Sequence, residues 1–278
     1  MATRAIIRRI WVTVALLFCA QVAITVLVVV VYRIDLGNHR WFVITLPIAH
    51  ATVGTVLSLL WRLFRTGDGR QLDRVNLPNV LSITRLSSAP TLLWLVLGAR
   101  TYDVAPVLIP LTALVFLTDL LDGQISRRTG QVTHIGKYLD SSSDYTLVFI
   151  VSIALVSYSL LAPWLFVLIL ARLALQWIGQ AILMVAQGWK LPFRTSFLGK
   201  ASIFAIMTFS AVSLVRLLPD RPDWFASVYA ALEIATAALT AVSLVEKLAI
   251  FTKDAIGVAR GGTSSVSPAR GATKRSPA

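Results

Sequence analysis

Four aspartates stand close together in one short stretch of an otherwise apolar chain. Asp119 and Asp122 are three residues apart, and Asp140 and Asp144 are four residues apart. Both spacings place the two side chains of a pair on one face of a helix. Carboxylates that converge in this way repel one another, and bound cations remove that repulsion. Oxygen ligands suit hard divalent ions such as Mg²⁺, Mn²⁺ or Ca²⁺ and are not typical of a zinc site.

The residues around the aspartates extend this chemistry to phosphate. Gly123 directly follows Asp122, and Gly136 precedes Asp140 by four residues. Glycines at such places let backbone or ligand approach closely. Arg127 has a side chain suited to binding phosphate. A single aspartate at a helix end is more often merely solvated, but this combination of carboxylates, glycines and arginine favours metal-assisted phosphoryl chemistry.

The composition indicates that these aspartates belong to a membrane protein. The chain has 278 residues, of which 56% are hydrophobic and only 14% charged, as is typical of an integral membrane protein. The net charge of +13 could suggest a nucleic-acid partner. We expect none, because membrane proteins collect basic residues in their cytoplasmic loops. The apolar runs are continuous rather than alternating, so they predict helices and not the strands of a barrel.

Eight apolar runs are long enough to predict membrane-spanning helices. The first begins after three arginines but is about 20 residues long, which is too long for a cleavable signal peptide, so we expect it to be retained. The predicted spans are 10–33, 41–62, 80–99, 105–122, 142–161, 164–187, 197–218 and 224–249.

The basic residues predict the orientation of these helices. Of the 26 Lys and Arg residues, 20 lie on the side of the two termini and five on the opposite side, while Arg172 lies inside a span. This bias places both termini and the aspartate stretch in the cytoplasm. We therefore expect a multi-pass protein of the cell (inner) membrane with its active site facing the cytoplasm.

The chain divides into four predicted parts. Two N-terminal transmembrane helices occupy residues 1–65, and an interfacial amphipathic segment, read as a short helix, occupies 66–80. A six-helix transmembrane core follows over 81–251. Residues 252–278 are rich in Gly, Ser, Pro and Arg and predict a disordered basic tail. The fold class is thus an all-α integral membrane protein with a six-helix core and two additional N-terminal helices, with both termini inside.

The aspartate stretch resembles a family signature. It reads D-x2-D-G-x2-S-R-x8-G-x3-D-x3-D. This pattern is similar to the signature of the CDP-alcohol phosphotransferases, D-x2-D-G-x2-A-R-x8-G-x3-D-x3-D, and departs from it only at Ser126, where alanine is usual. The upstream segment "LPNVLSITR" resembles the P-N-x-x-(S/T)-x-x-R segment of the same family. The six-helix membrane fold of the family agrees with the core counted here, and the N-terminal helices lie outside the resemblance.

The resemblance implies roles for individual residues. The four aspartates would hold one or two divalent ions, Mg²⁺ or Mn²⁺, and Asp144 would also be the general base. A CDP-linked lipid, CDP-diacylglycerol, would donate its phosphatidyl group to a small polar alcohol and release CMP. Residues implied to contact the CDP-lipid are Asn79, Ser82, Asp119, Gly123, Ser126, Arg127, Thr133 and Gly136.

The acceptor alcohol is indicated less sharply. Arg172, Arg194 and Lys200 could bind a second phosphate, as in glycerol 3-phosphate, and the first should face the bundle or an anionic ligand because an unpaired arginine in lipid is costly. The pieces around Arg172 and Lys200 resemble phosphatidylglycerophosphate and cardiolipin synthases of this family. This chain departs from them at Leu173, where glutamate is usual, at "GKASI" and at "LDSSSD". Inositol phosphate, phosphatidylglycerol and serine stay open as acceptors.

A membrane cation transporter is the rival class. Transporter sites lie near the middle of the membrane on broken helices, whereas these aspartates fall at predicted helix ends beside a polar loop. Release of CMP would distinguish the two classes, since only the enzyme produces it. We also expect a homodimer, to which the N-terminal helices could contribute contacts.

Overall fold

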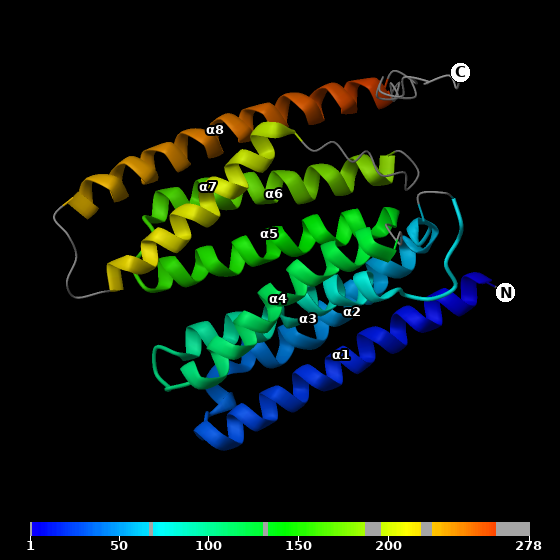
Figure 1. Ribbon diagram of the computed structural model, residues 1–278, viewed down its shortest axis with the longest axis horizontal. Coiled ribbons are helices and arrows are strands. Elements are labelled where there is room, and N and C mark those ends of the chain that lie inside the picture. The colour runs from blue at the N-terminus through cyan, green and yellow to red at the C-terminus, as the bar shows by residue number, and fades with distance from the viewer. Residues whose placement is uncertain (1, 67–68, 130–132, 187–195, 218–223, 260–278) are drawn as a thin grey trace, which may run out of the picture.

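The protein is a bundle of long helices over the residues that the computed structural model describes, which are 2–66, 69–129, 133–186, 196–217 and 224–259 (Figure 1). Strand structure there is limited to two isolated bridges. The side chains of some residues inside the helices, Asp119 and Asp122 among them, also lie outside the description. The long helices are α1 (Ala2–Tyr32), α2 (Arg40–Leu59), α3 (Leu77–Gly98), α4 (Ala105–Thr129), α5 (His134–Ser157), α6 (Pro163–Ala186), α7 (Phe197–Leu214) and α8 (Trp224–Ala259).

The helices confirm the predicted all-α class. In the described residues, six of them are long and apolar enough to cross a membrane, and α4 and α7 contain the shorter apolar stretches Ala105–Val115 and Phe197–Ser213. Large apolar side chains cover much of the outer surface, as expected for helices that face lipid. The number of spans that cross the membrane and their orientation remain predictions.

Three predicted boundaries, at residues 122, 142 and 252, lie inside helices because polar residues continue the helices. The helix α4 runs to Thr129 and α5 begins at His134, so the aspartates lie within helices and not at their ends. The helix α8 runs to Ala259, past the predicted start of the tail at 252, and residues 260–278 lie outside the described residues. Hydropathy marks where a helix leaves the apolar region, which is not where the helix ends.

The predicted amphipathic segment before the third span, residues 66–80, is helical among its described residues only at its end, where Leu77 to Val80 form the first turn of α3. Leu60 to Asn76, here called the linker, holds one short 3-10 turn (Trp61–Leu63), and after it the described residues form a loop up to the start of α3 at Leu77. The Leu72 N–H donates to the Phe64 carbonyl at 2.8 Å, which closes this loop on itself. Backbone hydrogen bonds therefore shape this loop without a helix.

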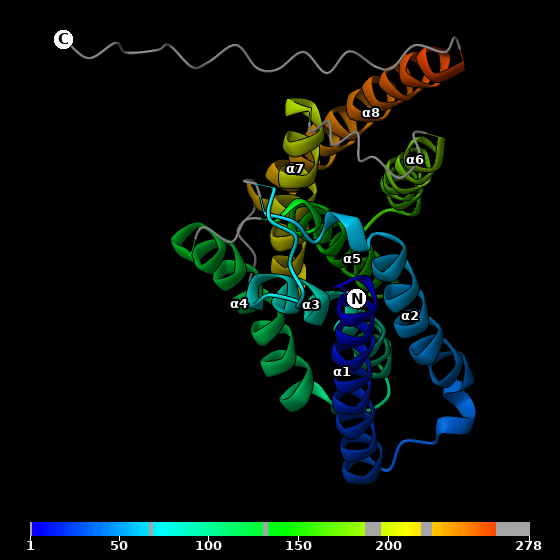
Figure 2. The same ribbon diagram turned by 90° about the vertical axis from the view of Figure 1, so that its right-hand side faces the viewer.

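The helix α5 joins two groups of helices. On one side α3 packs against α1, α2 and α4, and on the other α8 packs against α6 and α7, while α5 contacts α3, α6 and α7. Figure 2 shows α5 between these groups, with α6–α8 above it and α1–α4 below. The start of α1 and the end of α8 lie at the same end of the bundle (Figure 1). A side chain on α5 can thus be reached from both groups.

Buried polar contacts join the N-terminal pair, α1 and α2, to α3. The Gln21 amide nitrogen donates to Ser88 Oγ at 3.1 Å, and His50 Nε2 is hydrogen-bonded to Ser87 Oγ. All four residues are buried. Since a polar group without a partner is costly in an apolar environment, these bonds fix how the N-terminal pair sits on α3.

Candidate functional site

The helix α5 carries the two aspartates whose side chains are described. Thr133 caps the helix: its backbone is extended and its hydroxyl accepts the Gly136 N–H at 3.0 Å. The cap starts α5 at His134, so Asp140 and Asp144 lie on its second and third turns, one turn apart and on the same face. The structure thus brings together the second pair of the predicted metal ligands.

Arg85 of α3 holds both aspartates. Its Nη2 lies 3.3 Å from Asp140 Oδ1, and its Nη1 lies 3.7 Å from Asp144 Oδ1. The arginine side chain is 0% exposed, whereas those of Asp140 and Asp144 are 54% and 44% exposed. The buried guanidinium therefore contacts the two carboxylates from the protein interior, while their outer sides stay open to solvent or ligand. Arg85 also brings Ser82 into the site, with Nη2 3.5 Å from Ser82 Oγ.

A second contact between α3 and α5 involves Asn79. The Thr133 hydroxyl donates to Asn79 Oδ1 at 3.1 Å, and both residues are buried. The Asn79 amide nitrogen has no hydrogen-bond partner among the described residues. A Cβ on Gly136 would lie 3.0 Å from Asn79 Oδ1 and 2.9 Å from Thr133 Oγ1, so only glycine leaves room for this contact. Three residues predicted to touch the nucleotide are thus adjacent in the structure.

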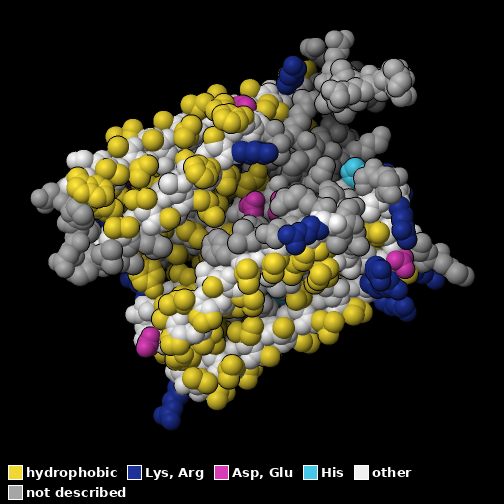
Figure 3. All heavy atoms as spheres, in the orientation of Figure 1, with side chains coloured by type: hydrophobic (Ala, Val, Ile, Leu, Met, Phe, Trp, Pro, Cys, Tyr) yellow, Lys and Arg dark blue, Asp and Glu magenta, His cyan; other side chains and the backbone are white. Residues whose placement is uncertain are grey.

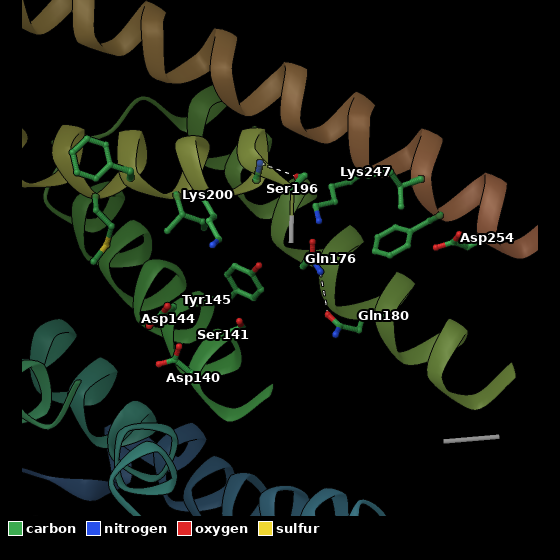
Figure 4. A pocket seen from close by; sticks show the side chains of 16 residues that line it. Asp140, Ser141, Asp144, Tyr145, Gln176, Gln180, Ser196, Lys200, Lys247 and Asp254 are labelled. Carbon is green, nitrogen blue, oxygen red and sulfur yellow. Dashed lines mark hydrogen bonds between the residues drawn. The ribbon is translucent and has the colours of Figure 1, made fainter. Parts of the chain in front are cut away.

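A cavity of about 780 Å³ opens from Asp140 and Asp144 toward α6, α7 and α8. Figure 3 shows acidic side chains in a hollow on this face, between surfaces rich in hydrophobic side chains. In Figure 4 the aspartates of α5 lie on one side of the cavity and Lys200 and Lys247 on the other. The wall also includes Asp254 of α8, polar residues of α6 and the α7 cap, and apolar residues of α7 and α8, among them Gln176, Gln180, Ser196, Phe204, Met207, Ile250 and Phe251.

Three cations gather on the far side of the cavity. Arg172 is buried, its Nη2 donates to the Gly199 carbonyl at 2.8 Å, and its guanidinium lies over the Tyr145 ring, 5.5 Å from the centroid. This confirms that Arg172 faces the bundle. Lys200 and Lys247 line the cavity, the first exposed and the second buried. A Cβ on Gly199 would lie 3.4 Å from Lys247 Cε and 3.7 Å from Arg172 Nη2, so the small residue lets the cations crowd together.

Several predicted site residues fall outside the described part. The α4 backbone carries Asp119, Asp122, Gly123, Ser126 and Arg127, but nothing is described of their side chains, and Arg194 lies outside the described residues altogether. Among the described residues no group of three His, Cys, Asp or Glu side chains gathers as metal ligands. The pair Asp140 and Asp144 nevertheless fits a hard divalent ion, because both carboxylates lie beside Arg85, are partly exposed and line the same cavity.

Comparison with known proteins agrees with this site. The model of the CDP-alcohol phosphatidyltransferase family matches residues 75–245, which includes α3 to α7, most of α8 and every predicted site residue. The chain belongs to the CDP-alcohol phosphatidyltransferase family. It is accordingly a transferase of phospholipid biosynthesis with apolar helices suited to a membrane.

Individual relatives point to the same chemistry. The cardiolipin synthase (CMP-forming) of Streptomyces coelicolor is 36% identical over 165 residues, which cover 58% of this chain and 74% of that protein. The CDP-diacylglycerol–glycerol-3-phosphate 3-phosphatidyltransferase of Bacillus subtilis is 27% identical over 155 residues, 52% of this chain and 79% of that protein. The enzyme of the same name from Aquifex aeolicus is 37% identical over 100 residues, 35% and 54% of the two chains. No solved structure matched the chain.

Two residues of the site were not predicted as such. Arg85 closes the "LPNVLSITR" segment, so its place in a motif, inside an apolar helix, was a usable signal. Lys247 was counted only among the basic residues of the cytoplasmic side. Its position within the apolar run of α8, where a charge needs a partner or a ligand, was the signal for a role in the site.

Proposed function

We propose that this protein transfers a phosphatidyl group from CDP-diacylglycerol to glycerol 3-phosphate and releases CMP. One observation carries the proposal: Asp140 and Asp144, held by Arg85, face across one cavity toward the cations Lys200 and Lys247. Carboxylates on one wall suit metal-bound pyrophosphate, and lysines on the other suit a second phosphate. The reaction needs both a metal-binding and a phosphate-binding side of the cavity, because it joins two substrates that each carry phosphate.

We assign the donor to the α3–α4–α5 side of the site. The family resemblance assigns the cytidine diphosphate to Asn79, Ser82, Gly123, Ser126, Arg127, Thr133 and Gly136. Asn79 is hydrogen-bonded to Thr133, and Gly136 leaves room for this contact. Both observations support a preformed nucleotide-binding site next to the aspartates. Asp119, Asp122, Asp140 and Asp144 would together hold Mg²⁺ or Mn²⁺, which supplies positive charge to the pyrophosphate oxygens and the departing CMP.

The protein's own side chains supply a general base and keep the carboxylates oriented toward the cavity. Asp144 lies next to the cavity, so it can accept the proton of an acceptor hydroxyl while that oxygen forms a bond to the lipid-bearing phosphorus. The bond between this phosphorus and the bridging oxygen breaks, and CMP leaves with the electron pair. Arg85 keeps both carboxylates turned toward the cavity, and binding both substrates in one place supplies much of the rate.

The acceptor phosphate is assigned to Lys200, Lys247 and Arg172. The first two line the cavity opposite the aspartates, and the third holds the Gly199 carbonyl at the start of α7. Arg194 was predicted to join them and lies outside the described residues. The two lysines in the cavity wall, with Arg172 buried beside Gly199, outnumber the one carboxylate of α8 there, Asp254, so they favour an acceptor that carries a phosphate.

Phosphatidylglycerol is a second candidate acceptor. It is favoured by the 36% identity with a cardiolipin synthase and by the apolar side chains Phe204, Met207 and Ile250 in the cavity wall. Its phosphodiester would occupy the same cations, and its acyl chains would lie against these apolar residues. The two acceptors can be compared directly in one assay.

The site would lie at the cytoplasmic surface of the membrane. The excess of basic residues at the end of the bundle that carries the aspartates supports this orientation. A soluble CDP moiety could then enter from the cytoplasm while the acyl chains stay in the bilayer. A homodimer remains a prediction, and the mass of the purified protein in detergent would test it.

The test of the proposed function is CMP release by purified protein in detergent. The assay contains CDP-diacylglycerol, Mn²⁺ or Mg²⁺, and either glycerol 3-phosphate or phosphatidylglycerol, with inositol phosphate and serine as further acceptors. We expect metal-dependent release with one of the first two, and a drop of about 10²- to 10⁴-fold in Asp144→Asn. Loss of release after chelation with EDTA, restored by added Mn²⁺, would check the metal.

The same assay can contradict the proposal. CMP release that needs no acceptor alcohol would show hydrolysis and not transfer. If no acceptor gives more CMP than Asp144→Asn does, the phosphatidyltransferase assignment is wrong. Cation flux into liposomes would then test the transporter alternative.

A further inference from the structure

We propose that the N-terminal pair and the linker position Asp140 and Asp144 by holding the first turns of α5. The N-terminal pair and all but the last two residues of the linker lie before residue 75, where the family match begins. The inference rests on the proposed function in taking the two aspartates as metal ligands. It assigns the additional helices a role in the geometry of the site and not only in the stability of the fold.

The linker is hydrogen-bonded to the start of α5. The His134 N–H donates to the Arg65 carbonyl at 3.0 Å, and Thr66 forms an antiparallel bridge with Thr133. Thr66 and Thr133 are both buried. The N–H of His134 is one of those at a helix start that have no partner within the helix, so the linker satisfies it from outside. Two consecutive residues at the start of α5 are therefore fixed to the linker.

Apolar side chains add to this contact. Ile135 and Leu139 of α5 are fully buried in one cluster with Leu60, Leu63 and Phe64 of the linker. Ile6, Ile10, Val14 and Leu57 of the N-terminal pair and Ile83 of α3 complete the cluster. Leu139 directly precedes Asp140 in the chain. A shift of these two turns against Phe64 would thus move the carboxylates with it.

The contact between the linker and α5 also reaches the residues assigned to the nucleotide. Thr133, which pairs with Thr66, also caps α5 through Gly136 and donates to Asn79. The linker therefore contacts the one residue that joins the cap of α5 to α3. The linker would act on the aspartates only through packing and hydrogen bonds with α5. It would therefore affect where the carboxylates lie and take no part in the reaction itself.

The opposite end of the N-terminal pair provides a matched control. Phe42 of α2 is 1% exposed and stacks on Trp94 of α3, with the ring centroids 4.6 Å apart. Phe64 is 0% exposed. Phe42 belongs to a cluster whose buried members come from α1, α2, α3 and the residues beside them, and none from α5. Removing either ring opens a cavity in a buried cluster, but only the cluster of Phe64 contains residues of α5.

The experiment compares Phe64→Ala with Phe42→Ala by direct binding of Mn²⁺, followed through the paramagnetic resonance signal of the unbound ion. The full chain is used in detergent, without substrates. We expect the Mn²⁺ midpoint to rise about tenfold in Phe64→Ala, the lower end of the effect typical of residues that support metal ligands, and to change less than twofold in Phe42→Ala. Phe64→Leu should fold and recover most of the affinity. Equal shifts in the two alanine variants, or no shift in Phe64→Ala, would overturn the inference.

A second variant tests the backbone contact. Proline is well tolerated at the first position of a helix, and the extended backbone of Thr133 (φ −106°, ψ 156°) suits a residue before proline. His134→Pro thus removes the N–H that donates to Arg65 without breaking α5, whereas His134→Ala keeps it. We expect a several-fold higher Mn²⁺ midpoint in the first variant only. Equal effects of the two changes would contradict a role for this hydrogen bond.

The two proposals can fail separately. A wild-type protein that binds Mn²⁺ but releases no CMP with any acceptor would refute the proposed reaction and leave the positioning role intact. A wild-type protein that releases CMP, with Mn²⁺ midpoints equal in all variants, would refute only the positioning role. A wild-type protein that binds no Mn²⁺ would overturn the positioning role outright.

Discussion

The two sides of the site differ in how tightly their charges are held. On the α3 side, Arg85 is fully buried and reaches both aspartates, and Asn79 is hydrogen-bonded to Thr133. On the α7–α8 side, Lys247 is buried but Lys200 is exposed, and both lysines line an open cavity of about 780 Å³. The α3 side is thus preorganised for a substrate part that does not vary, and the other side can admit acceptors of different size. Changes on the first side should affect the rate, and changes on the second should affect acceptor affinity.

Among the changes that test this difference between the two sides, the largest effect is expected at Arg85. Arg85→Lys keeps the charge but loses the planar group that reaches Asp140 and Asp144 together, so kcat should fall about 10- to 100-fold with little change in the acceptor KM. The measurement is steady-state CMP release. Arg9→Lys, in an exposed pair with Asp73 at 3.4 Å, is the matched control and should be neutral. If Arg85→Lys raised the acceptor KM without lowering kcat, the proposed difference between the two sides would be wrong.

The next effect is expected at Lys247. Lys247→Met keeps the apolar stem and removes the charge that faces the cavity, so the KM for the acceptor should rise roughly tenfold, as for the loss of a hydrogen bond to a charged group. The donor KM and kcat should stay near wild type. Lys253→Met, exposed on the same helix and not part of the cavity wall, is the control. An equal response to the two changes would argue against acceptor binding by Lys247.

A smaller effect is expected at Gly136. The new methyl group of Gly136→Ala would lie 3.0 Å from Asn79 Oδ1 and 2.9 Å from Thr133 Oγ1, so both side chains must move by a few tenths of an ångström. We expect a several-fold rise in the KM for CDP-diacylglycerol and no change in that for the acceptor. Titration of CMP release with donor at saturating acceptor measures it. An unchanged donor KM would place the nucleotide away from Asn79.

The smallest effect on activity is expected at Gly179, where the change should act on stability. A Cβ there would lie 2.6 Å from the Phe251 ring, so in Gly179→Ala either this ring or α6 must shift, at a cost of about 1–3 kcal/mol. The thermal unfolding midpoint in detergent should fall. Gly98→Ala, where a Cβ would meet nothing within 4 Å, should not lower it. Adding Phe251→Leu to Gly179→Ala should recover part of the loss, and no recovery would assign the strain elsewhere.

The sequence predicted the helices better than their ends. All eight apolar runs are helices, because a continuous apolar segment can satisfy its backbone only in this way in a membrane. The start of α5 at His134 depends on the Thr133 cap, and its contact with Arg65 depends on a residue far away in the chain. Hydropathy contains neither fact, so the predicted span began at residue 142, although the helix begins at His134.

The site was predicted in part for a similar reason. The spacing of Asp140 and Asp144 places them together through the helix period alone, whatever the rest of the chain does. Arg85 and Lys247 reach the site through contacts between helices that no local spacing encodes. Positive charge within an apolar helix was nevertheless visible in both cases, and it would have been a sound reason to look for an anionic partner.

The bonds of His50 and Gln21 with Ser87 and Ser88 have a consequence for biosynthesis. The helix α3 is the most polar of the early spans, with Arg85 and several hydroxyls buried within it. Because α1 and α2 are synthesised first, partners for two of these hydroxyls are already in the membrane when α3 leaves the ribosome. We expect α3 to insert poorly on its own and well behind α1 and α2, which glycosylation-tagged segments translated with microsomes would measure. The N-terminal pair would then act as an intramolecular chaperone for the insertion of the catalytic domain.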